Sequence, residues 1–202
     1  MAVIEKVTKQ TQNRFLNMYE LDTIRKNGNR GKYFVSSRAE KVDDLKLKTH
    51  VNKPDGVIIY AVTEDNSKVL LVRQYRYPID AYVYELPAGL VDEGEDFRTA
   101  AIREVHEETG MTLHPIEADP MFEAPRFTTV GMTDESCALV FGYVTGEPTA
   151  KYLEESEEII QVLADREEVR RILREENVAC QCAYHIVRFM QEEDSFAYVR
   201  KG

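Results

Sequence analysis

Hydrophobic and polar positions along this chain follow two different periodicities. Short apolar runs predict strands, and the clearest are 57–62 and 68–73, which the polar residues 64–67 join as a hairpin. Apolar residues at helical spacing predict helices over 165–175 and about 178–191. Further strands are predicted at 15–24, 33–35, 82–86, 138–144 and 159–163. Strands, then a helix, then strands and helices again indicate an α+β protein.

The helix in the middle of the chain is the best defined of these elements. Asp96 has the residue type of an N-cap, and Gly110 stands where a helix would end in a left-handed conformation. Between them Phe97, Ala101 and Val105 recur every four residues. This spacing predicts a helix that buries one apolar stripe.

Acidic side chains are concentrated on the same helix. Glu104 and Glu108 are four residues apart, so their carboxylates leave the same face. Arg103 precedes Glu107 by four residues and follows Glu95 by eight, within reach of either. Clustered carboxylates suit a hard divalent cation. A solvated acidic helix is the alternative, since repulsion at this spacing costs only about 0.2–0.5 kcal/mol.

Composition narrows the classes of protein that fit. The 202 residues leave room for one or two domains, and 43% hydrophobic with 31% charged residues is typical of a soluble globular protein. The net charge of −10 argues against a nucleic-acid partner. No apolar run approaches the ~18 residues of a membrane span, and residues 1–6 lack the layout of a signal peptide. Cys137, Cys180 and Cys182 cannot all pair, so free thiols in the cytoplasm are expected.

The first 50 residues are predicted to form a separate β unit. A turn at 27–31 separates the predicted strands 15–24 and 33–35, and the polar segment 52–56 then interrupts the chain. Residues 51–202 would form the main domain.

The spacing from Gly89 to Met111 resembles the Nudix box, the signature of hydrolases that cleave nucleoside diphosphates linked to another moiety. The matching positions are Gly89, Glu95, Arg103, Glu104, Val105, Glu107, Glu108, Gly110 and Met111. The resemblance implies the Nudix α/β/α sandwich with a mixed sheet, beside the small N-terminal β unit.

Other segments are similar to the ADP-ribose pyrophosphatase subgroup. They are 72–78, 84–89 and the acidic run 153–159. The resemblance implies hydrolysis of a nucleoside diphosphate sugar, ADP-ribose first, by a homodimer built through the N-terminal unit. One departure leaves GDP-mannose or UDP-glucose as alternatives: Val130 stands where the subgroup usually has proline, although Pro125 lies nearby.

The resemblance also implies a metal site. Glu104 and Glu108 would be the principal ligands of Mg²⁺, for which Mn²⁺ could substitute, and Glu107 and the Ala88 carbonyl would assist. Glu95 would orient Arg103.

Substrate contacts are predicted at four positions. Arg76 would grip a phosphate, or else be a surface arginine at the end of a strand. Tyr33 and Phe34 would stack on the base, with a place in the core as the alternative, and Arg38 would contact the base or a phosphate.

The general base is predicted in the acidic run. In an extended segment Glu155 and Glu157 would point to one side, and Glu155 is the first choice. The alternative is an exposed, solvated acidic loop. The whole protein has two interpretations as well: an enzyme, or a nucleotide-sugar-binding Nudix module without catalysis. Such modules typically lose box carboxylates, whereas this box is complete.

Overall fold

The computed structural model describes residues 1–155 and 157–200, so Ser156 of the predicted acidic run lies outside the described residues. The chain forms two compact units. The first comprises Met1–Asp55 and Pro125–Cys137, and the second comprises Gly56–Ala124 and Ala138–Gly202. No helix in the described part of the chain is long and apolar enough to cross a membrane.

The first unit is built on a three-stranded antiparallel sheet. Its order is β1 (Val3–Lys9), β2 (Asn17–Ile24) and β3 (Arg30–Ser37). The short helices η1 (Val42–Asp44) and α1 (Lys46–Thr49) follow. A small core forms from Tyr19, Leu21, Val35 and Leu45.

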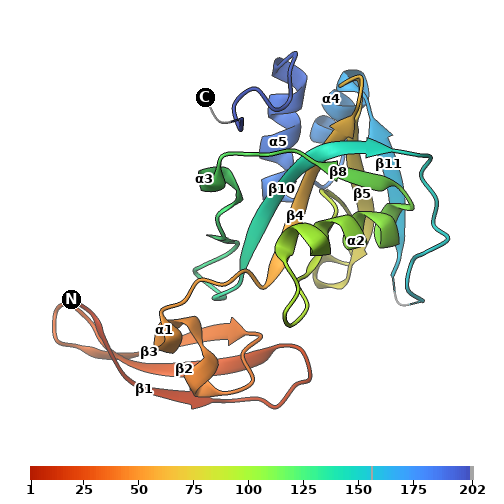
Figure 1. Cartoon of the computed structure of the whole chain (residues 1–202). Helices are drawn as coiled ribbons and strands as arrows, with labels where there is room; N and C mark the ends of the chain where they lie inside the picture. The colour runs from red at the N-terminus through yellow and green to blue at the C-terminus, as the bar shows by residue number, and fades with distance from the viewer. Residues whose placement is uncertain (156, 201–202) are drawn as a thin grey trace. The chain divides into compact units, whose positions relative to one another are not determined.

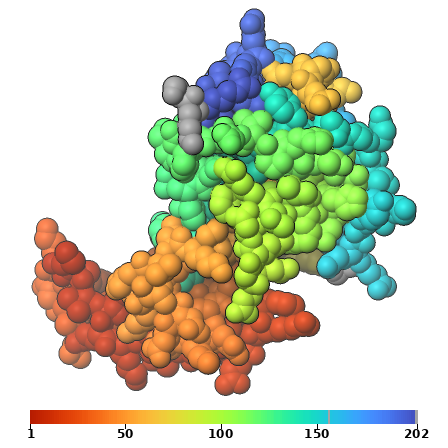
Figure 2. All heavy atoms as spheres, viewed as in Figure 1, coloured from red at the N-terminus to blue at the C-terminus, as the bar shows by residue number. Residues whose placement is uncertain are grey.

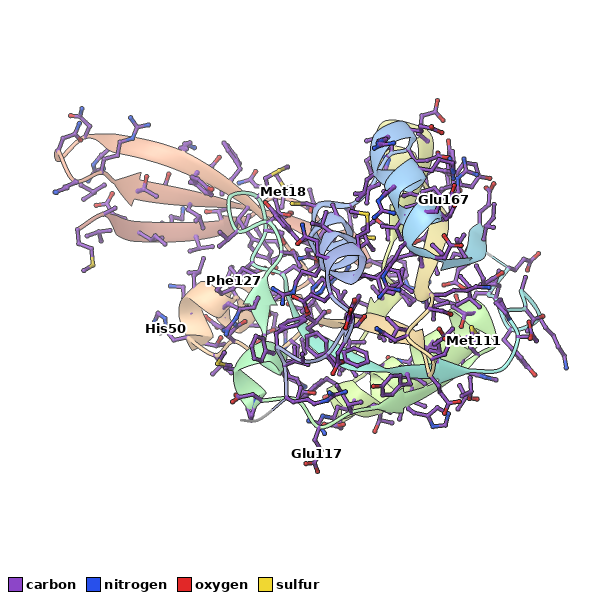
Figure 3. All side chains as sticks on the ribbon, turned by 90° about the horizontal axis from the view of Figure 1, so that it is seen from above. Met18, His50, Met111, Glu117, Phe127 and Glu167 are labelled. Carbon is purple, nitrogen blue, oxygen red and sulfur yellow. The ribbon has the colours of Figure 1, made fainter. Side chains whose placement is uncertain are left out.

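A segment from the middle of the chain completes this unit. The Ser36 amide donates to the Met132 carbonyl at 2.9 Å, and the Tyr33 hydroxyl donates to the Gly131 carbonyl at 2.5 Å. Within the same segment β9 (Arg126–Phe127) pairs with the first residues of β10 (Ser136–Thr145). Phe127 is labelled in Figure 3, as is His50 at the end of α1.

The second unit contains the larger, mixed sheet (Figure 1). Its main strands, in spatial order, are β11 (Ile159–Ala164), β5 (Val69–Arg76), β4 (Gly56–Thr63), β10 and β8 (Thr112–Pro115). Two short strands extend it, since β6 (Ala81–Glu85) pairs with β5 and β7 (Ala88–Leu90) pairs with β4. Between β5 and β6 lies the turn η2 (Tyr77–Ile79).

Helices cover both faces of this sheet (Figure 1). On one face α2 (Phe97–Thr109) packs its Ala101 and Val105 against Val57 and Ile59 of β4. On the other face α4 (Arg166–Glu175) and α5 (Cys180–Gln191) pack against residues that include Tyr60. Because successive residues of a strand point to opposite faces, β4 contributes to both cores. The short α3 (Pro120–Glu123) follows β8.

The predicted fold is confirmed, and so are its main elements. The hairpin, the strands and the three long helices lie where the hydrophobic pattern predicts them. The pattern missed the strands β1, β7 and β8, and β9, which has only two residues. The strand β1 is largely exposed, and β7 and β8 are three and four residues long, so none of them carries a long apolar run.

Candidate active site

Helix α2 begins and ends as its sequence predicts. The Asp96 carboxylate accepts hydrogen bonds from the amides of Arg98 and Thr99, at 3.0 and 3.3 Å. Gly110 ends the helix with φ 69°, a left-handed conformation that glycine adopts without strain. Met111, labelled in Figure 3, follows and is buried. These two caps fix the length of the helix that presents the acidic residues.

Arg103 links this helix to the preceding loop. Its guanidinium donates to both Glu95 oxygens, at 3.1 and 3.0 Å, and to the Leu90 carbonyl at 3.0 Å. It also donates to Glu104 at 2.8 Å and to Glu107 at 2.9 Å. The paired bonds to Glu95 raise the pKa of Arg103 and lower the pKa of Glu95. Glu95 and Arg103 are thus paired, and the orienting role of Glu95 stays a prediction.

Glu104 and Glu108 are acidic groups held largely out of water. Glu108 is only 4% exposed, and one of its oxygens accepts from the Ala88 amide at 3.3 Å. Burial raises the pKa of Glu108 well above its usual range, and the neighbouring Glu104 raises it further. Burial likewise raises the pKa of Glu104. Two buried carboxylates that destabilise each other's charge are stabilised when a cation joins them.

The donor set therefore fits a hard divalent cation, as the chemistry of carboxylate and carbonyl oxygens requires. Among residues 1–155 and 157–200, no three acidic, histidine or cysteine side chains converge as they stand into a complete metal-binding group. Arg103 is one reason for this lack of convergence, because its guanidinium pairs with the Glu104 and Glu107 carboxylates. The predicted ligand set of Glu104, Glu107, Glu108 and Ala88 stays a prediction.

Gly89 lies in close contact with the Glu104 carboxylate. A Cβ atom at this position would lie 1.9 Å from the carboxyl carbon of Glu104. Only glycine at the start of the box leaves the Glu104 carboxylate in this position beside β7.

This contact leads to a prediction for Gly89→Ala. The added methyl group should displace the flexible Glu104 carboxylate rather than the strand, and misplacing a reacting group by about 1 Å can cost on the order of 10²-fold in rate. We expect kcat to fall at least about 10-fold while the melting temperature changes little. Turnover and thermal unfolding of the variant measure this, with Gly131→Ala, where nothing lies within 4 Å of the added Cβ and φ is not positive, as the control for an added methyl group. Wild-type turnover in Gly89→Ala would contradict the expectation.

The acidic residues border a cavity of about 450 Å³ in the second unit. That volume is in the range of small-molecule sites. Its lining comprises Gln74, Arg76, Ala88, Gly89, Leu90, Asp92, Arg103, Glu104, Glu107, Glu108, Glu154 and Glu157. Six of these side chains are carboxylates and two are guanidiniums, so the charge of the cavity favours cations.

The acidic loop contributes to this lining in a way the sequence did not predict. Glu157, the second choice for the base, lines the cavity together with Glu154. Glu155, the first choice, is exposed and is not among the lining residues. The segment is not extended: the Glu157 amide donates to the Glu154 carbonyl at 3.0 Å, which closes a turn over Glu155. Glu155 and Glu157 therefore do not share one side as alternate residues of a strand would.

Arg76 lies at the cavity and is also paired. Its guanidinium donates to the Glu85 carboxylate on the neighbouring strand β6. It remains 46% exposed, so part of the group faces solvent. Gln74, two residues earlier on β5, lines the same cavity and was missed, although the period of two along a strand places it on the side of Arg76.

The remaining predicted contacts belong to the first unit. Tyr33 is 45% exposed and Phe34 is 51% exposed, so the alternative that placed them in the core is wrong. They lie on a strand whose buried residue is Val35. Arg38 pairs with Glu135 at 3.0 Å within the same unit. The contacts of Tyr33, Phe34 and Arg38 with a substrate stay predictions.

Comparison with known families identifies the fold and its box. A model of the NUDIX domain matches residues 52–181. The chain belongs to the Nudix family. With every box carboxylate in place, it is a Nudix hydrolase. The resemblance of Gly89–Met111 to the Nudix box is thereby confirmed.

Curated Nudix relatives give the chain several neighbours. The methanol dehydrogenase activator of Bacillus methanolicus is 28% identical over 166 residues, which are 78% of this chain and 87% of that protein. The ADP-ribose pyrophosphatase of Bacillus subtilis (strain 168) is 36% identical over 85 residues, 42% of this chain and 43% of that protein. The ADP-ribose pyrophosphatase of Saccharomyces cerevisiae is 44% identical over 66 residues, 32% of this chain and 29% of that protein. The latter two similarities therefore span less than half of either chain.

A solved structure shares the fold over nearly its whole length. The crystal structure of an ADP compounds hydrolase superposes with a TM-score of 0.65 at 20% sequence identity, covering 93% of this chain and 92% of the other. This likeness supports the Nudix α/β/α architecture.

Proposed function

We propose that this protein is a Mg²⁺-dependent hydrolase of the pyrophosphate bond in nucleoside diphosphate sugars, with ADP-ribose as its first substrate. One water is consumed, and the products are AMP and ribose 5-phosphate. The single observation that supports this most is the cavity in which the Nudix carboxylates, Arg76 and Glu157 meet. Relatives named as ADP-ribose pyrophosphatases support the substrate class.

Each part of the cavity has a role in this proposal. Glu104, Glu107 and Glu108, with the Ala88 carbonyl, would hold the cation, which when bound neutralises phosphate charge and makes water more acidic. Arg103, held by Glu95, fixes the helix against the loop that precedes it. Arg76 would bind a phosphate through its exposed part, and Glu157 would accept the proton of the attacking water.

Incubating the purified protein with a panel of nucleotide sugars tests the proposal. The panel contains ADP-ribose, GDP-mannose and UDP-glucose, each with Mg²⁺, with Mn²⁺ and with a chelator. We expect ADP-ribose to give AMP with the highest kcat/KM, and chelation to abolish the reaction. Higher kcat/KM for another sugar would reassign the substrate. Tight binding without any product would favour the non-catalytic module instead.

We also propose that the first unit forms a homodimer interface. Its sheet exposes Met18 and Phe34, which are 40% and 51% exposed on strands β2 and β3. A sheet of three strands with a small core is marginal alone, and exposed apolar side chains are common at sites of two-fold association.

Mass measurement in solution tests this. Light scattering at micromolar concentration should give about twice the chain mass of 23.3 kDa, and Phe34→Asp should shift the population toward the monomer because it replaces an exposed apolar side chain of the proposed interface with a charge. Lys48→Glu is the charge-changing control, since Lys48 is exposed on α1, and the adjoining Leu45 packs against the opposite face of the sheet. A wild-type mass of one chain would contradict the dimer.

A further inference from the structure

The acidic loop between β10 and β11 is attached to the second unit at both ends. Its described residues, 146–155 and 157–158, lie on the surface of that unit (cyan in Figure 2). It carries Glu154 and Glu157 into the lining of the cavity. A loop that presents a reacting group needs fixed ends, because small displacements of such a group are costly in rate.

The first end of the loop is attached to helix α2. The Thr149 amide donates to the Thr109 carbonyl at 2.8 Å. The Tyr152 ring lies over His106, with ring centroids 4.3 Å apart and planes 36° from parallel. Helix α2 also carries Glu104 and Glu108, so this end of the loop is fixed relative to the predicted metal ligands.

The second end is attached to the β5–β6 hairpin. The Tyr75 amide donates to the Glu158 carbonyl at 3.2 Å, and the Tyr82 hydroxyl donates to a Glu158 carboxylate oxygen. The Tyr82 ring is held in turn, with the Arg73 guanidinium 4.4 Å from its centroid and the Tyr75 ring at 5.6 Å. The position of the Tyr82 hydroxyl is therefore fixed by contacts other than its hydrogen bond to Glu158.

Glu157 lies between these attachments. Its amide donates to the Glu154 carbonyl, and its carboxylate accepts from the Glu154 amide, both at 3.0 Å. It is also the direct neighbour of Glu158, and adjacent Cα atoms are held about 3.8 Å apart. A shift of the Glu158 backbone would therefore be transmitted to the backbone of Glu157.

We propose that Tyr82 is a positioning residue for hydrolysis. Its hydroxyl holds Glu158 and, through it, holds the Glu157 carboxylate at the cavity. This inference rests on the proposed function, in which Glu157 is the general base. The competing explanation is that Tyr82 and Glu158 form an exposed surface bond that contributes only to stability.

Single variants separate the two explanations. Tyr82→Phe keeps the ring on Arg73 and removes only the hydroxyl, and we expect kcat for ADP-ribose to fall on the order of 10-fold with KM changed less than about 2-fold. Glu158→Ala should do the same, whereas Glu158→Gln, which retains an accepting oxygen, should restore turnover. Tyr77→Phe is the matched control, since it lies on the same hairpin, contacts Tyr75 and is 82% exposed. Wild-type kcat in Tyr82→Phe would overturn the proposal.

A double-mutant cycle tests whether Tyr82 acts through Glu157. Groups that act as one unit give non-additive effects. Tyr82→Phe should therefore cost nothing further in a Glu157→Gln background. If the two losses multiply instead, Tyr82 does not act through Glu157 and the inference is wrong.

Hydrogen exchange makes the test independent of the substrate. Without the Tyr82 hydroxyl, the Glu157 amide should exchange at least about 5-fold faster, because the local opening of the turn becomes easier. Unchanged exchange in Tyr82→Phe would overturn the positioning role even if no activity were found. A wild-type protein that hydrolyses no nucleotide sugar, but shows the faster exchange in the variant, would refute the proposed function and leave the attachment of the loop established.

Discussion

Glu104→Gln and Glu108→Gln are each expected to lower kcat by at least about 10²-fold at saturating Mg²⁺. Glutamine keeps the size of the side chain but removes the negative charge that would hold the cation. Both positions are largely shielded from water, with Glu108 4% exposed and the Glu104 side chain 12% exposed. Water therefore screens the lost charge little, and the effect should be large. Steady-state turnover of ADP-ribose measures it.

Controls distinguish this loss from unfolding. Glu107→Gln should lower kcat less, because the Glu107 side chain is 43% exposed. Glu93→Gln should leave kcat unchanged, because Glu93 is exposed in the preceding loop. In the absence of metal, Glu108→Gln should leave the melting temperature unchanged or raised, because it removes one of two neighbouring buried charges. Near-wild-type turnover in both Glu104→Gln and Glu108→Gln would contradict the prediction that these residues bind the metal.

The parts of the site that the sequence predicts are those fixed by short-range chemistry. An N-cap needs a side-chain acceptor two or three residues from the amides it serves, and Asp96 meets Arg98 and Thr99 in this way. The pairing of Arg103 with Glu107 follows from helical spacing alone. The buried stripe of α2 follows from the same period.

Contacts between residues far apart in the sequence could not be predicted from the hydrophobic pattern. The strand β7 is three residues long and is defined by its pairing with β4, which lies about thirty positions earlier in the sequence. The segment 125–137 gave no sign that it would join the first unit, because its bonds with Ser36 and Tyr33 span nearly a hundred residues. Contacts of this kind leave no local periodicity.

The acidic loop illustrates an assumption that failed. Treating the run as extended makes Glu155 and Glu157 equivalent, whereas the turn between Glu154 and Glu157 brings those two residues to the cavity. The run contains neither glycine nor proline, and its Ser156 is only a weak sequence signal for a turn. The preference for Glu157 over Glu155 as the proposed base therefore rests on the cavity lining and not on the sequence pattern.

Glu157→Gln is expected to lower kcat by about 10²–10⁴-fold, the usual cost of removing a general base. Glu157 lines the cavity, and its carboxylate is oriented by the Glu154 amide at 3.0 Å. The amide of glutamine cannot accept the proton of water at neutral pH, so the rate should fall while KM changes little. Single-turnover rates at saturating Mg²⁺ measure the chemical step directly.

Glu155→Gln is the matched control, because it makes the same change two residues away in the same loop. Glu155 is exposed and should retain near-wild-type turnover, as should Glu158→Gln, which keeps its acceptor for Tyr82. A larger loss for Glu155→Gln than for Glu157→Gln would return the role to Glu155. Unchanged turnover in the Glu155/Glu157 double variant would show that the base lies elsewhere, and Glu154, the remaining loop carboxylate in the cavity lining, would be the next group to change.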